Sequence, residues 1–587
     1  MRGLGSATTE YSRRLKPNRP TVKTGPPDYH TTLCLPWNSQ TAVGGVGAAG
    51  AVLNPYSSLT YAGSLYLYPH IVRQTLSVAS QLISSARAST FFFSRLDERP
   101  SRRDRARLPH CIFSPLGIFS WRAKMISNRI IVASRHVKRA SVFAPNSSKR
   151  RGRGLATIAP VTPVASASRN HKVVVIGGGS AGLSISHQLL RTGPFSPDDI
   201  AIVDPAEWHH YQPGWTLVGG GLKSKQELRR PLRSLIDPKL KFYQQTVSTF
   251  APGDNSIQLG NGDTLTYEHL VVAPGIKIDY GSIKGLPEAL ADPNSLVSSV
   301  YGYDTCDKVF GTFEKLQRGN AIFTQPAGAI KCAGAPQKVM WLALDYWKRA
   351  GLYNGSNNAN AAASPINITF ATGTPAMFGV PKYSAKLDEL RKERGVEGLF
   401  QHDLVAVEGN TATFARPDGK ESVTRQFDLL HVVPKMGPHA FVKDSLLADA
   451  AGFVDVDQAT TRHTKYANVW SSGDASSLPT SKTAAAITSQ APILVSNLLR
   501  SLAGKEPEPK YDGYTSCPLT TEYGKVLLAE FKYGGVPKET FGDLIGFDQA
   551  VPRRAFYHLK KDFFPWVYYN SMVKGTWSGP TGWLNES

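Results

Sequence analysis

The segment that most constrains how this chain folds is residues 172–182, KVVVIGGGSAG. Four β-branched residues run directly into glycines at 177, 179 and 182, and an apolar helical pattern follows. In such a strand–turn–helix unit Gly177 permits the tight turn, Gly179 lets the backbone approach a pyrophosphate, and Gly182 allows close packing of helix on strand. The N-terminus of the helix adds free N–H groups and a partial positive charge. The segment therefore predicts a dinucleotide-binding fold.

An acidic residue after a second buried-strand pattern supports this prediction. Residues 200–203 read IAIV, and Asp204 follows 22 residues beyond Gly182. A carboxylate at this place accepts hydrogen bonds from an adenosine ribose. The two strands and the acid make the motif far more specific than the glycine spacing alone.

The net charge of +22 is concentrated at the N-terminal end of the 587 residues. Residues 1–170 hold 25 Lys and Arg against five Asp and Glu, so the rest of the chain is nearly neutral. A nucleic-acid-binding domain needs a basic face on its folded part, so no nucleic-acid partner is expected. The length predicts more than one domain.

The basic N-terminal part divides into two predicted segments. Residues 125–170 contain no acid and are rich in Arg, Ser and Ala, which is typical of an organellar transit peptide; a disordered basic tail is the alternative. Residues 1–124 have no recognisable period and are expected to be unstructured or spurious. The functional start is then expected at Met125.

The cysteines give no sign of a metal site or a disulfide framework. Five are scattered along the chain without a C-x-x-C pair or a His/Cys cluster, at positions Cys34, Cys111, Cys306, Cys332 and Cys517. No run of about 18 apolar residues occurs, so no membrane-spanning helix is expected.

Alternating strand and helix patterns predict an α/β protein with two Rossmann-like domains. The first comprises residues 171–285 and resumes over 429–505, and the second is inserted between them as residues 286–428. The second is expected to contain helices over 304–317 and 337–349, strands over 321–324 and 366–371, and a surface loop over 351–365. The final helix of the first domain is expected over 482–502.

Residues 506–587 are expected to be an aromatic-rich, membrane-facing segment. Within 553–583, nine aromatic rings alternate with Arg553, Arg554, Lys560, Lys561 and Lys574. Rings beside basic groups suit a membrane interface, where the ring is buried and the charge meets anionic headgroups. Core packing of a terminal helix is the alternative.

Two further motifs indicate which dinucleotide binds. Ser472-Gly473-Asp474 follows a buried strand, and the run LVVAPG ends at Gly275. With the glycine loop, they resemble the two-dinucleotide-binding-domain flavoproteins, in which the acid of the G-D motif binds the ribityl and pyrophosphate side of FAD. FAD is therefore the expected cofactor.

The second domain has no glycine fingerprint of its own, which disfavours a nicotinamide donor. The equivalent strand end reads QPAGAIKCAGAPQK and places Cys332 just before a helix expected near Pro336. The helix N-terminus and Lys331 would both lower the pKa of the Cys332 thiol, so Cys332 is predicted to be a nucleophilic thiolate. A buried structural cysteine is the alternative.

The motifs KCAGAPQKVM (331–340), YQPGWTLVGGG (211–221), LPTSKTAAA (478–486) and KYDGYTSCPL (510–519) resemble the mitochondrial sulfide:quinone oxidoreductase family. The resemblance covers residues 170–580. It implies an FAD enzyme on the surface of the inner mitochondrial membrane that oxidises sulfide through a cysteine pair, a persulfide and attack on flavin C4a. It also implies ubiquinone as electron acceptor and a small thiol or sulfite as sulfur acceptor.

The motifs carry the family's site residues to this chain. Cys332 matches one redox cysteine, and Lys482 is expected to face the flavin and stabilise its anionic reduced form. The expected FAD-binding residues are Gly177, Gly179, Ser180, Ala181, Gly182, Asp204, Gln212, Val247, Ala273, Gly275, Gly473, Asp474 and Lys482.

One departure concerns the second redox cysteine, which the family is expected to place directly after the G-D acid, where this chain has Ala475. Three interpretations stay open: Cys306 substitutes, Cys332 acts alone, or the chain is a redox-responsive homologue without the cysteine pair. Cys517 is interpreted as structural. A type II NADH:quinone reductase is the alternative enzyme.

Overall fold

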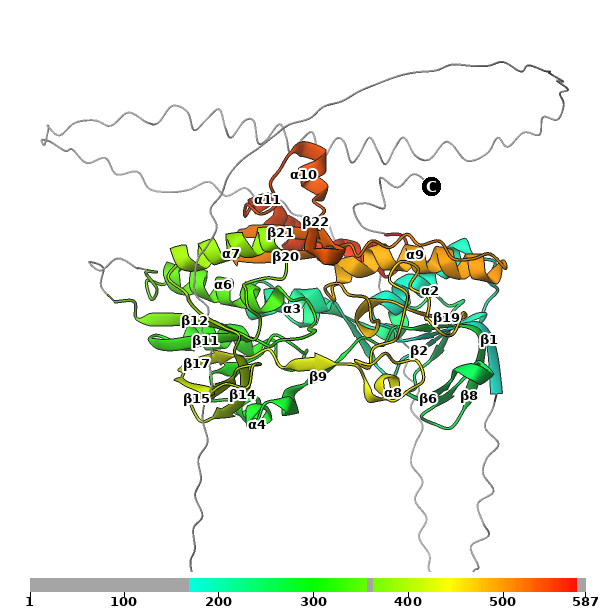
Figure 1. Cartoon of the computed structure of the whole chain (residues 1–587), viewed down its shortest axis with the longest axis horizontal. Coiled ribbons are helices and arrows are strands. Elements are labelled where there is room, and N and C mark those ends of the chain that lie inside the picture. The colour runs from blue at the N-terminus through cyan, green and yellow to red at the C-terminus, as the bar shows by residue number, and fades with distance from the viewer. Residues whose placement is uncertain (1–167, 356–362, 578–587) are drawn as a thin grey trace, which may run out of the picture. The chain divides into compact units, whose positions relative to one another are not determined.

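The computed structural model describes residues 168–355 and 363–577, all within one compact unit that runs from Arg151 to Ser587 (Figure 1). The predicted segment 1–124, almost all of 125–170 and part of the loop 351–365 lie outside the described residues. No helix in the described part of the chain is long and apolar enough to span a membrane.

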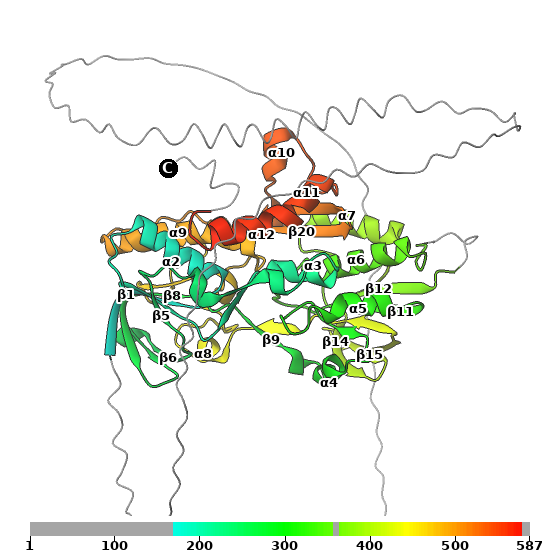
Figure 2. The ribbon, with the colours of Figure 1, turned by 180° about the vertical axis from the view of Figure 1, so that it is seen from behind.

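A mainly parallel sheet forms the first domain, in the order β5-β2-β1-β8-β7-β6, with β19 also paired to β8. Its central strands are continuous apolar runs, as expected for a sheet covered on both faces. Helices α2 and α9 pack against each other over this sheet (Figures 1 and 2). The elements are β1 (Ser168–Ile176), α2 (Ser180–Thr192), β2 (Ile200–Val203), β5 (Lys241–Tyr243), β6 (Val247–Ala251), β7 (Ser256–Leu259), β8 (Thr264–Val272), β19 (Val469–Ser471) and α9 (Ala484–Leu502).

The second domain is a five-stranded parallel sheet in the order β10-β17-β11-β12-β13. A small antiparallel sheet, β14-β15-β16, adjoins it. The elements are β10 (Val297–Ser298), α5 (Lys308–Lys315), β11 (Gly319–Gln325), α6 (Ala335–Arg349), β12 (Ile366–Thr372), α7 (Pro381–Glu393), β13 (Glu397–Phe400), β14 (Asp403–Glu408), β15 (Thr411–Ala415), β16 (Val423–Gln426) and β17 (Leu429–His431).

The predicted return to the first domain at residue 429 is wrong. Strand β17 pairs with β10 and β11 of the second sheet, so the second domain extends beyond residue 428. The chain crosses back afterwards through β18 (Lys435–Gly437), which pairs antiparallel with β9 (Lys277–Asp279). An apolar run identifies a buried strand but does not indicate which sheet it joins, and this caused the error.

The C-terminal part begins with an antiparallel sheet of β20 (Thr515–Glu522), β21 (Lys525–Lys532) and β22 (Val536–Pro537). Strand β20 packs on α6, which joins this sheet to the second domain. The short helix α10 (Thr540–Ile545) projects from the body in both views (Figures 1 and 2). A helical stretch follows through α11 (Arg554–His558), η8 (Leu559–Phe563), α12 (Phe564–Val567) and η9 (Tyr568–Met572), with π-helical turns at η8 and η9.

The glycine loop adopts the predicted strand–turn–helix geometry. Gly177 has a φ of 101°, and a Cβ added there would lie 2.4 Å from the Ala273 oxygen. A Cβ on Gly182 would lie 1.8 Å from the Gly177 oxygen, whereas one on Gly179 would have no atom within 4 Å. Gly177 and Gly182 therefore maintain the turn, and Gly179 keeps the space beyond it open.

We predict that alanine at Gly182 lowers stability, whereas alanine at Gly179 lowers only cofactor binding. Gly182→Ala forces Cβ into backbone and should lower the free energy of unfolding by about 2–3 kcal/mol, as overpacking does. Gly179→Ala should leave the thermal midpoint of cofactor-free protein unchanged but reduce the bound dinucleotide, because its Cβ occupies the open space. Thermal unfolding and cofactor content check both; equal destabilisation of the two variants would contradict the assignment.

Candidate active site

A cavity of about 540 Å³ lies where the two sheets and the C-terminal part meet. One end is formed by the glycine loop and the segments 211–216 and 472–474, and its middle contains the loop of Cys332. The other end is apolar, with contributions from β21, α10 and the C-terminal helices. The cavity thus extends from the predicted dinucleotide site, past a thiol, to a region suited to an apolar ligand.

Most of the predicted FAD-binding residues line this cavity, whereas Gly177, Gly182, Asp204 and Val247 do not. Gly177 and Gly182 shape the glycine turn, and the Asp204 carboxylate accepts a hydrogen bond from it. Val247 is buried in the core on β6. The residues that line the cavity are Gly179, Ser180, Ala181, Gln212, Ala273, Gly275, Gly473, Asp474 and Lys482.

The residues present at this end fit an FAD molecule. A Cβ added at Gly179 or Gly275 would meet no atom within 4 Å, so the backbone is open to a ligand at both points. The N-terminus of α2 adds unpaired helical N–H groups for the pyrophosphate. Asp204 accepts from the Gly178 N–H at 2.6 Å and the Ala206 N–H at 2.7 Å, which holds its carboxylate beside the turn.

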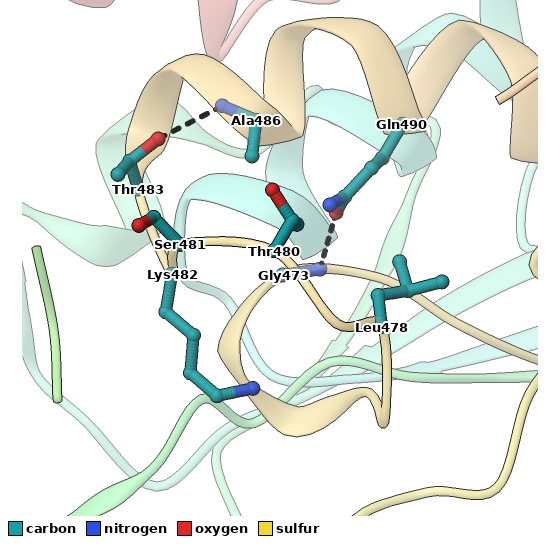
Figure 3. Close-up of a pocket in the computed structure, with 8 residues that line it drawn as sticks. All are labelled: Gly473, Leu478, Thr480, Ser481, Lys482, Thr483, Ala486 and Gln490. Carbon is teal, nitrogen blue, oxygen red and sulfur yellow. Dashed lines mark hydrogen bonds between the residues drawn. The ribbon is translucent and has the colours of Figure 1, made fainter. Parts of the chain in front are cut away.

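Gln490 and Thr483 organise the corner of the cavity behind the G-D motif (Figure 3). The Gln490 Oε1 accepts from the Gly473 N–H at 2.8 Å, and the Thr483 hydroxyl caps α9 by accepting from Ala486 N–H. The Lys482 side chain extends away from the helix, and its Nζ donates to the Ser476 carbonyl at 3.0 Å. Burial lowers the pKa of Lys482 to about 8. Its predicted role at the flavin stays a prediction.

The structure brings a second thiol to Cys332 from a distant part of the sequence. The Sγ atoms of Cys332 and Cys517 lie 3.2 Å apart, and both residues are free thiols. Cys517 is 1% exposed on β20, with its side chain on the face that packs against α6. The structure therefore gives Cys332 a neighbouring thiol that the sequence interpretations did not place there, whereas the structural role expected for Cys517 stays a prediction.

Backbone contacts hold the two sulfurs together. Cys332 has a φ of 53°, which is uncommon for a residue with a side chain, and its N–H donates to the Lys482 carbonyl at 2.8 Å. The Cys332 carbonyl accepts from the Ala335 N–H at 2.8 Å, where α6 begins. A Cβ on Gly334 would lie 2.5 Å from the Cys517 Sγ, so only glycine lets the loop approach β20 this closely.

A buried ammonium group favours the thiolate form of Cys332. The Lys338 Nζ lies 3.1 Å from the Cys332 Sγ, one turn into α6. The hydrogen bond from Cys517 and the charge of Lys338 hold the pKa of Cys332 well below its usual value, despite burial. The prediction of a low pKa agrees with this geometry, but Lys331 is not the group that contacts the thiol. The Lys331 Nζ instead donates to the Gln212 Oε1 at 3.1 Å.

Cys306 does not join the pair. Its Sγ contacts the Tyr303 carbonyl at 3.6 Å within the core of the first domain, and it is absent from the cavity wall. Burial raises the pKa of the Cys306 thiol to about 12, so it has little thiolate character. Ala475 is buried after the G-D acid.

Lys560 is a site residue that the sequence analysis assigned to the membrane interface. It lies on η8, is buried, and lines the cavity near the two cysteines. Burial, together with the like charge of Lys338, lowers the pKa of Lys560 to about 7. A sequence pattern of rings and basic residues cannot show which of several lysines on a helix points inward.

Tyr568 is another residue that the sequence did not reveal. Its hydroxyl is 2.6 Å from the Ser180 Oγ and 2.8 Å from the His209 Nε2, and the His209 Nδ1 lies 2.9 Å from the Gly178 carbonyl. Burial lowers the pKa of His209 to about 4, so its ring is neutral at physiological pH. This network ties the C-terminal helices to the glycine loop.

The comparisons with known proteins agree with this arrangement. A model of the pyridine nucleotide-disulphide oxidoreductase family matches residues 171–314. The chain is 48% identical over 436 residues to "Sulfide:quinone oxidoreductase, mitochondrial" of Schizosaccharomyces pombe, covering 71% of this chain and 93% of that protein. The protein of the same name from Dictyostelium discoideum is 44% identical, with 70% and 88% covered.

The chain belongs to the mitochondrial sulfide:quinone oxidoreductase family. The X-ray structure of the sulfide:quinone oxidoreductase from Aquifex aeolicus shares its fold, with a TM-score of 0.54 at 16% identity, covering 70% of this chain and 92% of that one. The family resemblance and the α/β fold with two Rossmann-like domains are confirmed.

The contact between Lys338 and Cys332 predicts how the thiol responds to pH. Lys338→Met removes the cation that stabilises the thiolate, so the pKa of Cys332 should rise. A rise of one unit makes alkylation of reduced protein about tenfold slower wherever the pH is below the parent's pKa. Iodoacetamide labelling of Cys332 between pH 5 and 9, followed by mass spectrometry, measures this. Lys331→Met is the matched control and should label as the parent does; identical profiles for all three proteins would contradict the assignment.

Proposed function

We propose that Cys332 and Cys517 are the redox pair with which this chain oxidises sulfide. Oxidation of sulfide coupled to reduction of a quinone is the activity of the family to which the chain belongs. The single observation that supports the proposal most is the distance of 3.2 Å between the Cys517 Sγ and the Sγ of Cys332, which lines the cavity. Small movements convert such a contact into a disulfide of about 2.05 Å.

The charges around the pair favour one direction of attack. Hydrosulfide attacks the Cys517 sulfur of the oxidised pair, which breaks the S–S bond, forms a persulfide on Cys517 and releases the Cys332 thiolate. Cys332 is the better leaving group because the Lys338 ammonium, 3.1 Å from its Sγ, stabilises the departing thiolate. A small thiolate or sulfite then takes the outer sulfur and leaves Cys517 as a thiolate. The two thiolates lose two electrons and re-form the disulfide.

FAD is the group that accepts these two electrons and passes them to the quinone when bound in the cavity. The family's flavoprotein character and the fit of the glycine loop support FAD. Cys332 lines the same cavity as the N-terminal turn of α9, so the thiolate side of the pair is the one that reaches the cofactor. Burial raises the pKa of the Asp474 carboxyl group, and the charges of Lys331 and Lys482 offset part of this rise.

The apolar end of the cavity suits ubiquinone and a membrane surface. Leu544 lines the cavity and is also 56% exposed, so the cavity opens among apolar side chains. Trp566, on the C-terminal helices, is 60% exposed. These residues support attachment to the surface of the inner mitochondrial membrane, with the quinone entering from the lipid. The mitochondrial location follows that of the relatives.

The alternatives raised by the sequence are less well supported. The relatives at 48% and 44% identity are sulfide:quinone oxidoreductases, which does not favour a type II NADH:quinone reductase. A homologue that lacks the cysteine pair was suggested by Ala475 alone, and Cys517 removes the reason for that suggestion.

Anaerobic titration of the holoprotein with sulfide tests the proposed pair. Sulfide should bleach the flavin absorbance of the parent and of Cys306→Ser, but not of Cys332→Ser or Cys517→Ser. Dithionite should bleach all four proteins, which shows that the cofactor is bound and reducible. Bleaching of the Cys517→Ser variant by sulfide at the parent's rate would refute the pair.

A further inference from the structure

Strands β20 and β21 present different chemistry on their two faces. On one face, Cys517 and Leu519 pack with α6 beside Cys332. On the other, Ser516 pairs with Glu530 and Pro518 pairs with Leu528, and all four residues line the cavity. The sulfur chemistry therefore uses one face of the sheet, and the second face has a carboxylate that this chemistry does not employ.

Glu530 is a buried carboxylate with many hydrogen bonds and no ionic partner. It is 2% exposed, and no Lys, Arg or His lies within ion-pair distance of it in the described parts of the chain. Its Oε1 accepts from the Tyr514 hydroxyl at 2.6 Å and the Thr540 hydroxyl at 3.1 Å. Its Oε2 accepts from the Thr540 N–H and the Gln549 side chain, both at 2.8 Å. A buried acid without a cation is costly and often has a function.

Tyr514 is the hydroxyl group that links this acid to the cavity. It lies just before β20, is buried, and lines the cavity together with Glu530 and Thr540. Burial and the neighbouring charge of Glu530 hold the pKa of Tyr514 well above its usual value of 10. Its hydroxyl is therefore protonated at physiological pH and can act as a donor.

The surroundings of the pair indicate its ligand. Leu528, Phe541, Leu544, Phe563 and Phe564 line the same end of the cavity, which is otherwise apolar. A few polar groups in an apolar cavity fix the orientation of a ligand with polar atoms on an apolar body. A quinone head group, with two carbonyl oxygens on an apolar ring, has this chemistry.

We propose that Tyr514 and Glu530 deliver protons to the quinone bound at this end of the cavity. The proposal deepens the proposed function, because it assigns residues to the quinone half of the same reaction. Quinone reduction consumes two electrons, supplied by sulfide through the cofactor, and two protons. In each transfer the Glu530 carboxylate first takes up a proton from solvent. The Tyr514 hydroxyl then gives its proton to a quinone oxygen and takes the new proton from the Glu530 carboxyl group.

Thr540 provides the connection from Glu530 to solvent. Its hydroxyl bonds Glu530, and Thr540 is half-buried at the start of the projecting helix α10. Before each transfer the Glu530 carboxylate takes up its proton from solvent on this side. Two such cycles convert one quinone into one quinol, and the pair returns to its starting state.

The other charged groups near the pair are already engaged with partners. Lys538 lies 5.8 Å from the centre of the Tyr514 ring, but its Nζ is bound to Asp512 at 2.9 Å. Glu539 accepts from Tyr383 at 2.8 Å and pairs with Lys382 at 2.7 Å, which in turn pairs with Asp548. Lys560 lies on the wall of the same cavity. These groups would contribute to any measured pH profile, so a pH profile alone cannot isolate the role of Tyr514 and Glu530. The test therefore compares an electron acceptor that takes up protons with one that does not.

Stopped-flow measurement of the two half-reactions tests the proposal, with Glu530→Gln and Tyr514→Phe as variants. Reduction of the flavin by sulfide should proceed within about twofold of the parent's rate. Reoxidation of dithionite-reduced holoprotein by saturating short-chain ubiquinone should be slower by about 10²-fold, which is typical of losing a general acid. Reoxidation by ferricyanide, which takes up no proton, should be unchanged.

Glu539→Gln is the matched control, because Glu539 is a neighbouring carboxylate, directly before α10, that does not line the cavity. It should reoxidise with quinone as the parent does. Parental rates with quinone in both test variants would overturn the proposal. An equal loss with quinone and ferricyanide would also overturn it, by revealing a structural role. Failure of sulfide to bleach the parent would refute the proposed function instead, since the dithionite experiment is independent of sulfide.

Discussion

The close approach of the Cys332 loop to strand β20 is the contact on which the site depends. It needs a glycine at position 334, where a Cβ would meet the Cys517 sulfur, and a left-handed backbone at Cys332. Hydrogen bonds to the Lys482 carbonyl and from the Ala335 N–H hold that backbone in place. Three parts of the chain, from both Rossmann-like domains and the C-terminal sheet, therefore have to dock correctly before two sulfurs can meet.

The electrostatics follow from this docking. Lys338 extends from α6 to the sulfur pair, and Lys560 approaches from the C-terminal helices, so two buried cations face two thiols. Burial alone would keep both thiols protonated and at least one lysine neutral. The proximity of the lysines to the thiols offsets part of the cost of burying charge. The Cys332 thiolate therefore forms easily, whereas a second thiolate at Cys517 is hard to form. Such an asymmetric pair suits an exchange in which one sulfur leaves and the other retains the transferred atom.

The sequence predicted the fold well where the signal was local. The glycine loop, Asp204 and the buried-strand pattern at 200–203 gave the first domain, and the helix after Cys332 begins at Ala335, one residue before the expected Pro336. The assignment of residue 429 to the first domain failed because strand pairing is not encoded in an apolar run. Cys517 was missed for a similar reason: it is 185 residues from Cys332, and only the docking of β20 on α6 brings the sulfurs together. Its alternation with Leu519 on β20 was the available signal, since both positions face α6.

The hydrogen bonds of Tyr568 with Ser180 and His209 connect the C-terminal helices to the dinucleotide end of the cavity. The last helices of the chain close over the N-terminal turn of α2, where Ser180 and Ser184 bond Tyr568 and the Met572 carbonyl. A dinucleotide that occupies the cavity would lie beneath this closure. Ser180 lines the cavity and also bonds Tyr568, so a dinucleotide bound there would contact the residue that anchors the C-terminal helices. Binding of the dinucleotide and docking of these helices would then stabilise each other at this turn.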